Sequence, residues 1–175
     1  KDVLHEDFAP AATEYASVSY IRSMAEGSYG TILLPFAPDE KSLENYAFYA
    51  LAESGDGYLR FEEIAEPQAN TPYLYSLREG KENIAITGGR TKISTDIEDY
   101  SVDGWKTVGS FTNKTIDTNN GNYYAFSTAK SEVNRVTNRL TVLPYRAYFV
   151  AEVPQKSAFS IYIGGTTSMV KISSD

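Results

Sequence analysis

The sequence predicts an all-β protein: a single antiparallel β-sandwich of the jelly-roll kind, with roughly a dozen short strands and at most one short helix. Three observations support this fold class. Glycine-bearing turn signals recur along the chain, the segments between them alternate between apolar and polar residues, and the 175 residues include 14 tyrosines, which favour strands. A closed barrel is the less favoured arrangement of the same strands.

Four turn signals separate the expected strands. They are Ser54-Gly55-Asp56-Gly57, Gly88-Gly89, Asn119-Asn120-Gly121-Asn122 and Gly164-Gly165. Glycine reaches the positive φ of short hairpin turns without steric cost. We therefore expect Gly88-Gly89 and Gly164-Gly165 each to close a tight antiparallel hairpin.

Most segments between these turns have the period of two that is typical of a half-buried strand. Tyr73, Tyr75 and Leu77, for example, fall on one face of such a segment. The stretches Thr31–Leu34 and Tyr145–Val150 are apolar on both faces, which predicts that they form central strands.

Prolines mark strand ends, and one aspartate marks the start of a helix. Pro35, Pro72 and Pro144 lie at expected strand ends, where a missing N–H group is tolerated. Asp39 can cap a helix of at most two turns that ends at Tyr46.

The chain is expected to form one domain. Residues 1–12 predict a flexible N-terminal segment without the apolar run of a signal peptide, and residues 13–175 predict the sandwich. No linker or internal repeat interrupts the second range. A chain of this size buries roughly 70% of its unfolded surface, which is enough for a core without disulfide bonds.

Five side chains from core-facing positions are predicted to be buried: Leu34, Phe36, Tyr73, Phe149 and Ile161. Burial of each contributes about 1.5 to 3 kcal/mol.

Trp105 is the one tryptophan, and it could stack on a sugar ring as aromatic platforms do. Its expected strand places it on the same face as Phe111. This arrangement favours packing in the core or at its rim over a sugar platform.

Composition excludes several partners and cofactors. The net charge is −7 without a basic run, so we expect no nucleic acid partner. No stretch reaches the ~18 consecutive apolar residues of a membrane helix, so no membrane insertion of this segment is expected. The chain has no cysteine, which removes disulfides, thiol nucleophiles and thiolate metal sites. No phosphate-binding glycine motif occurs, and we expect no cofactor.

No catalytic or metal-ligating residue is predicted. His5, the only histidine, lies in the polar N-terminal segment, and Gly27-Ser28-Tyr29-Gly30 lacks the spacing of a nucleophile elbow. Asp117–Asn122 is similar to the start of a calcium loop, but its glycine falls at position 5 instead of position 6, which favours a hairpin turn.

Two acidic clusters leave alternatives open. The first contains Glu62, Glu63 and Glu66, and the second contains Asp96, Glu98, Asp99 and Asp103. Solvated surface charge is the default interpretation. A carboxylate pair for glycoside hydrolysis, or a surface Ca²⁺ near Asp96–Asp103, are the alternatives.

Arg146 is the only charge in the apolar run Leu143–Ala151. An unpaired guanidinium in a central strand is very costly. We expect Arg146 to be partly buried and paired with a carboxylate or with backbone carbonyls, in a structural role.

An ordered set of segments resembles a C-terminal β-domain of secreted and cell-surface proteins of Bacteroidetes, which often follows leucine-rich (BspA-like) or immunoglobulin-like modules. The segments are Tyr29–Ala37, Asn70–Leu74, Gly104-Trp105 with Gly109-Ser110-Phe111, and Leu143–Phe149. The resemblance covers about residues 15 to 165. It implies an extracellular or cell-surface location and no established catalytic residue.

The expected function is therefore that of a non-enzymatic surface module, structural or adhesive, which presents its sandwich to protein or glycan partners. A carbohydrate-binding module is the first alternative, and a glycoside hydrolase with a carboxylate pair is the second. The sequence assigns no ligand-binding residue and no oligomeric state.

Overall fold

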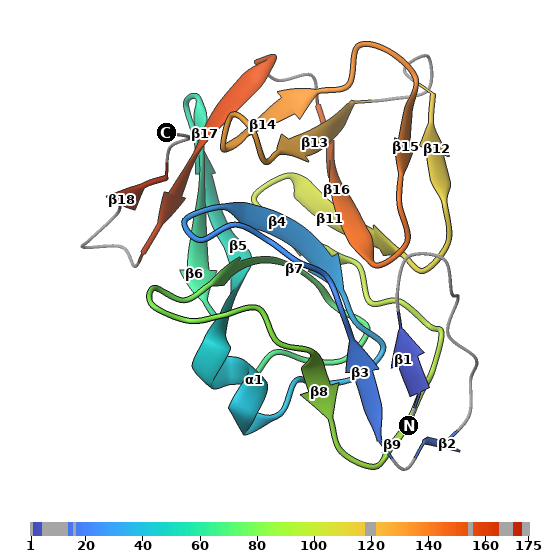
Figure 1. Cartoon of the computed structure of the whole chain (residues 1–175). Helices are drawn as coiled ribbons and strands as arrows, with labels where there is room; N and C mark the ends of the chain where they lie inside the picture. Colours follow the sequence, from blue (N-terminus) through green and yellow to red (C-terminus); the bar gives the residue numbers. More distant parts are fainter. Residues whose placement is uncertain are drawn as a thin grey trace.

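The computed structural model describes residues 2–4, 14–15, 17–117, 122–153, 156–164 and 170–172 (Figure 1). It is mostly β, with 51% of residues in strands and 4% in helix. The described strands are β1 (Asp2–Leu4), β2 (Glu14–Tyr15), β3 (Val18–Tyr20), β4 (Tyr29–Leu33), β5 (Tyr46–Gly55), β6 (Tyr58–Glu63), β7 (Pro72–Leu77), β8 (Ile86–Gly88), β9 (Thr91–Lys92), β10 (Tyr100–Val102), β11 (Trp105–Ser110), β12 (Lys114–Ile116), β13 (Tyr123–Ser127), β14 (Glu132–Arg135), β15 (Leu140–Val142), β16 (Arg146–Ala151), β17 (Ala158–Ile163) and β18 (Val170–Lys171). The all-β prediction is confirmed.

One sheet of 11 strands dominates the molecule, in the order β10-β11-β16-β13-β14-β17-β6-β5-β7-β4, with β18 added beside β17. The single sandwich is not confirmed, because this sheet curls into a half-barrel. β17 and β6 pair in parallel and join two groups of strands that a sandwich would keep in separate sheets. β1 also pairs in parallel, with β3, in a small sheet that includes β8.

The curl of the sheet brings its last strand, β4, against the central strand β16. The Leu33 N–H donates to the Tyr145 carbonyl at 2.9 Å. The Thr31 hydroxyl donates to the Ala147 carbonyl at 3.2 Å and accepts from the Ala147 N–H at 3.0 Å. Thr31–Leu34 is therefore buried although its strand is an edge by pairing. The other apolar stretch is central as predicted, because β16 lies between β11 and β13.

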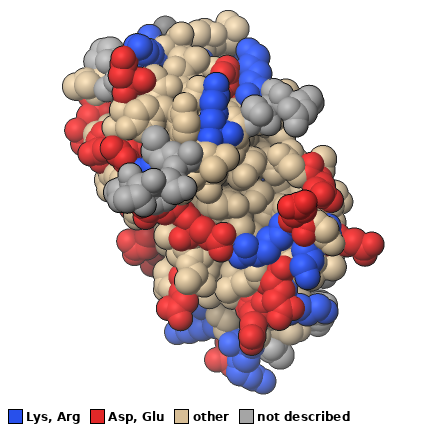
Figure 2. Space-filling view, turned by 90° about the vertical axis from the view of Figure 1, so that its left-hand side faces the viewer, with Lys and Arg blue, Asp and Glu red and all other residues tan. Residues whose placement is uncertain are grey.

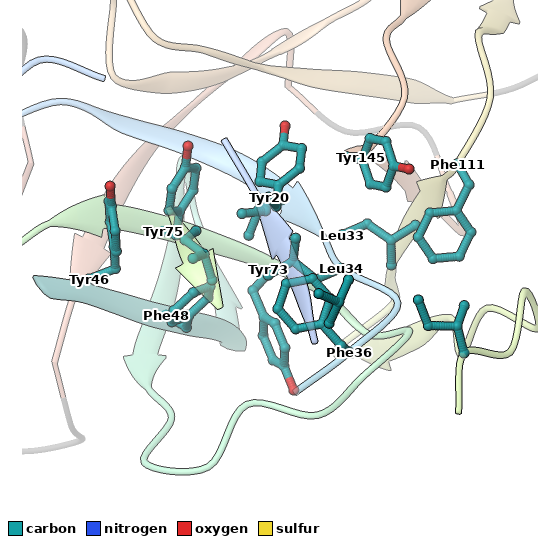
Figure 3. Packing of buried hydrophobic residues seen from close by; sticks show 14 of the residues in the cluster. Tyr20, Leu33, Leu34, Phe36, Tyr46, Phe48, Tyr73, Tyr75, Phe111 and Tyr145 are labelled. Carbon is teal, nitrogen blue, oxygen red and sulfur yellow. The ribbon is translucent and has the colours of Figure 1, made fainter. Parts of the chain in front are cut away.

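The β5–β7 layer separates two apolar clusters. Tyr73, Tyr75 and Leu77 of β7 pack into the first cluster, together with β3, β4 and β8, whereas Leu74 of the same strand packs into the second. Figure 3 shows the first cluster, where the Phe48 and Tyr75 rings stack with centroids 6.0 Å apart. The predicted alternation is correct, and it serves two cores.

All five predicted core residues are buried, with at most 8% of any of them exposed. Trp105 is 2% exposed, and its ring meets those of Tyr124 and Phe159 edge-on at 4.8 and 5.0 Å. The core interpretation of Trp105 is thus confirmed. Phe111 packs in the other cluster, with its ring 5.7 Å from that of Tyr145 (Figure 3).

The predicted short helix is present as α1 (Glu40–Asn45). Asp39 caps it, accepting hydrogen bonds from the Ser42 N–H at 3.0 Å and from the Thr87 hydroxyl at 2.6 Å. The prolines lie as expected: Pro72 begins β7, while Pro35 and Pro144 fall outside the ends of β4 and β16.

One of the first two turn predictions is confirmed and the other is wrong. Ser54–Gly57 does join the antiparallel strands β5 and β6. The hairpin at Gly88-Gly89 is wrong, because β8 pairs with β3 and β9 pairs with β2. Gly88 is required for close packing instead: a Cβ there would lie 2.7 Å from the Phe36 ring.

The other two turns also differ from the prediction. β17 and β18 pair antiparallel, as predicted, with Ile163 opposite Val170. Six sequence positions separate this pair, more than a tight two-residue turn has. The hairpin expected at residues 119–122 is wrong, because β12 pairs with β15 and β13 pairs with β14 and β16. Residues 118–121 and 165–169 themselves lie outside the described ranges.

Candidate functional site

The larger of two adjoining hollows has a volume of about 560 Å³ and is lined by two arginines, Arg22 and Arg146. We call it the arginine groove. One side is formed by the β3–β4 loop and by β4, and the other by β13, β15 and the residues that follow them. The groove lies at the seam where the half-barrel brings β4 against β16.

Arg22 is held in place by neutral groups. Its Nε donates to the Tyr75 hydroxyl at 2.8 Å, one Nη to the Tyr20 hydroxyl at 3.3 Å, and the other Nη to the Thr31 carbonyl at 2.5 Å. The guanidinium also lies over the Tyr75 ring, 4.8 Å from its centroid. These contacts fix the orientation of the side chain. Because the hydroxyl and carbonyl partners carry no negative charge, they do not neutralise the guanidinium.

Arg146 contributes a second positive charge to the same groove. It is partly buried, as predicted, and its pairing with a carboxylate or with carbonyls stays a prediction. Burial raises the pKa of the Tyr20 hydroxyl, while the charges of Arg22 and Arg146 act in the opposite direction. Tyr20 therefore lies within electrostatic reach of both guanidinium groups.

The rest of the groove is apolar or hydroxyl-bearing. Met24, Phe126 and Leu143 supply apolar surface, and Ser28 and Thr141 supply hydroxyls. Among the described residues that line the groove there is no aspartate, glutamate or histidine. The lining thus offers hydrogen-bond donors and positive charge, without a general base of the usual kinds.

Side chains and one neighbouring strand cover the open edge of β4. Thr128 donates to the Tyr29 carbonyl at 3.2 Å, Arg22 donates to the Thr31 carbonyl, and Leu33 donates to the Tyr145 carbonyl. Edge strands in natural proteins are protected in this way against pairing with a further strand. The groove is consequently unsuited to adding a peptide as an extra strand to β4.

A second hollow of about 450 Å³ shares Tyr29 with the groove, and we call it the tyrosine hollow. Tyr49 also lines it, with its ring 5.8 Å from that of Tyr29 and its hydroxyl 2.9 Å from the Ser76 hydroxyl. Burial and the neighbouring Tyr49 hydroxyl raise the pKa of Tyr29 to about 12. Glu26 and Glu79 add two carboxylates to the lining.

Three of the seven acidic residues singled out from the sequence have structural partners. Glu62 and Glu63 pair with Arg60 and Arg78 at 2.6 and 2.9 Å. Asp103 accepts from the Ser54 N–H at 3.0 Å. Within the described ranges, no group of three or more acidic or histidine side chains could hold a metal ion.

The remaining sequence candidates contribute nothing to the groove. His5 lies outside the described residues, and so does most of the Asp117–Asn122 segment. Buried Trp105 cannot serve as a sugar platform. Ser28 and Tyr29, which belong to the segment without the spacing of a nucleophile elbow, do line the groove.

Sequence reasoning singled out Arg146 and missed Arg22. The sequence did contain an indication of Arg22. It lies two positions after Tyr20 and four after Val18, so its charged side chain is expected on the same face as two buried residues. No sequence pattern predicts that Arg22 and Arg146 line the same groove. They are 124 positions apart, and only the curl of the sheet brings their segments together.

Fold and groove together describe an all-β protein with a half-barrel sheet and an arginine-lined seam. Comparisons of the chain with models of protein families, with curated proteins and with solved structures find no match. No helix in the described part of the chain is long and apolar enough to cross a membrane.

Proposed function

We propose that the chain is a non-enzymatic binding module of an extracellular or cell-surface protein, and that its ligand occupies the arginine groove. The observation that carries the proposal is the preorganised Arg22, which lines a 560 Å³ hollow and is held by hydrogen bonds to Tyr20, Tyr75 and Thr31. Rigid polar groups in an apolar concavity are typical of binding sites.

Two further features support the proposal. The first favours binding over catalysis, and the second favours a glycan or protein ligand over nucleic acid. The described lining of the groove contains no acidic or histidine side chain that could act as a base. Figure 2 shows acidic and basic side chains interspersed over one face of the molecule, without the continuous basic area that phosphate backbones require. The proposed location is supported by the resemblance to surface β-domains.

A carbohydrate-binding module is the more specific alternative, and the tyrosine hollow favours it. Half-buried Tyr29 offers a ring and a hydroxyl, and the two glutamates offer further polar groups, while the buried Tyr49 supports the Tyr29 ring from 5.8 Å. Sugars are bound by such combinations of an aromatic surface with surrounding hydrogen-bond partners. In this alternative the tyrosine hollow replaces Trp105 as the aromatic surface.

The proposal is tested by screening the purified chain against immobilised glycans and candidate surface proteins. Saturable binding is expected, and Arg22→Ala should weaken it about tenfold or more, because hydrogen bonds to charged groups contribute about 1.5 to 3 kcal/mol. Arg90→Ala is the matched control, since Arg90 is 71% exposed and pairs only with Glu14 among the described residues.

Two results would contradict the proposal. One is binding that Arg22→Ala leaves unchanged. The other is sustained release of reducing ends from a glycan that stops in Glu26→Gln or Glu79→Gln, which would indicate hydrolysis by a carboxylate pair in the tyrosine hollow.

A further inference from the structure

We propose that the arginine groove binds the anionic group, carboxylate or sulfate, of an acidic glycan whose adjoining neutral sugar lies in the tyrosine hollow. This inference rests on the proposed function, because it assigns the ligand of the same groove.

The anionic group follows from the charges in the groove. Arg22 makes its hydrogen bonds to two tyrosine hydroxyls and one carbonyl, so no carboxylate is among its partners. Those bonds use three of the five N–H donors of a guanidinium and leave two for a ligand. Arg146 adds a second positive charge to the lining. An anion in the groove would pair with the charge of Arg22, which its hydroxyl and carbonyl partners leave uncompensated.

The lining of the tyrosine hollow favours an uncharged sugar next to the anionic group. Glu26, Glu79 and Arg78 line that hollow, and Arg78 is paired with Glu63 at 2.9 Å. The two glutamates would therefore repel a second anionic group, whereas sugar hydroxyls can donate to carboxylates.

Tyr29 lines both hollows, and its ring lies beside that of Tyr49 in the tyrosine hollow. In the proposed complex the ligand runs from Arg22 past the edge of β4 to the Tyr29 ring. The two hollows therefore favour a chain in which an acidic unit is followed by a neutral one.

The covered edge of β4 favours a glycan over an acidic peptide. An extended peptide would gain affinity by pairing with a free strand edge. At β4 the outward carbonyls of Tyr29 and Thr31 already accept hydrogen bonds from Thr128 and Arg22. A peptide of several acidic residues would also place negative charge beside Glu26 and Glu79, while the charge of Arg78 in the same hollow is paired with Glu63.

The test uses calorimetric titration of the whole chain with four probes. Hyaluronan oligosaccharides alternate a carboxylate-bearing sugar with a neutral one, and keratan sulfate oligosaccharides carry sulfate without carboxylate. Carboxyl-reduced hyaluronan is the neutral control, and poly-glutamate is the acidic peptide. Binding of hyaluronan assigns a carboxylate, and binding of keratan sulfate alone assigns a sulfate. Either should bind at least about tenfold more tightly than the neutral control and lose affinity as salt is raised.

Two substitutions on the β12–β15 ribbon test the place of binding without touching the core. Thr141 is exposed and lines the groove, so Thr141→Glu adds a competing carboxylate and should weaken binding about tenfold. Thr115 is its exposed cross-strand partner outside the groove lining, and Thr115→Glu makes the same charge change as a control. Both variants should keep the wild-type unfolding midpoint, since both side chains are exposed.

The inference is overturned if neither acidic glycan binds, if carboxyl-reduced hyaluronan binds equally well, if poly-glutamate binds more tightly than both glycans, or if Thr141→Glu has no more effect than Thr115→Glu. Failure of the inference and of the proposed function can be told apart. A neutral glycan or a protein whose binding needs Arg22 would leave the groove as a binding site while excluding the acidic glycan.

Discussion

At the residue scale, Arg60 is the only charged side chain that is buried among the described residues, at 4% exposure. Its Nε donates to Glu53 at 2.8 Å, and one Nη donates to Glu62 at 2.6 Å and to the Gly164 carbonyl at 2.8 Å. The two carboxylates are 41% and 44% exposed. Arg60 therefore depends on its partners more than they depend on Arg60, because water can solvate them in its absence.

This asymmetry makes a prediction about stability. Removing both carboxylates, as Glu53→Ala with Glu62→Ala, should lower the free energy of unfolding by about 3 to 5 kcal/mol, since a buried guanidinium loses both charged partners. Arg60→Met should cost less, about 1 to 3 kcal/mol. Urea denaturation of the three proteins measures the order. Equal losses, or a larger loss for Arg60→Met, would contradict this account of Arg60.

At the element scale, the small sheet and α1 are connected through Asp39. Its carboxylate accepts from the Ser42 N–H and hydroxyl and from the Thr87 hydroxyl, so one side chain caps the helix and anchors β8. Burial alone would raise the pKa of Asp39, but the hydrogen bonds from Thr87 and Ser42 outweigh burial and lower it.

A lowered folded-state pKa defines the expected pH dependence. The stabilisation by the Asp39 charge is fully present above the unfolded-state pKa of about 3.9 and is lost as pH falls through the lower folded-state value. Asp39→Asn should thus cost more stability at pH 7 than near pH 2. Chemical denaturation at both pH values measures the difference, with Asp99→Asn, at an exposed site, as the control. A cost independent of pH would show that the charge of Asp39 contributes nothing.

At the scale of the whole molecule, the half-barrel depends on the seam between β4 and β16. Thr31 is 8% exposed, and its hydroxyl satisfies both the N–H and the carbonyl of Ala147. The same seam places Arg22 and Arg146 in one groove. Loss of the seam should therefore weaken the fold and the candidate site together.

Thr31→Val tests the seam, because valine keeps the shape of threonine and removes the hydroxyl. Two buried backbone groups would lose their partner, at about 1 to 3 kcal/mol each, so we expect a loss of about 2 to 6 kcal/mol. Thr31→Ser keeps the hydroxyl and serves as the control. Hydrogen exchange at the Ala147 amide should accelerate in Thr31→Val and stay slow in Thr31→Ser. Unchanged protection in Thr31→Val would mean that the seam does not depend on this side chain.

Local patterns in the sequence determined much of the secondary structure. The all-β class, the cap at Asp39, the five buried side chains and the alternation in β7 all depend on side-chain period or on contacts within a few residues. The same patterns misassigned Gly88-Gly89, because a glycine needed for close packing against Phe36 has the same sequence signal as one needed for a turn.

Only the tertiary structure decided how the strands associate. The parallel pairing of β17 with β6 and the contact of β4 with β16 join segments about 100 positions apart, and period-two alternation is identical for a sandwich and a half-barrel. The site depends on the same choice. Arg22 and Arg146 each have a recognisable place in their own segment, but the groove exists because the twist and curl of one continuous sheet bring the two segments together.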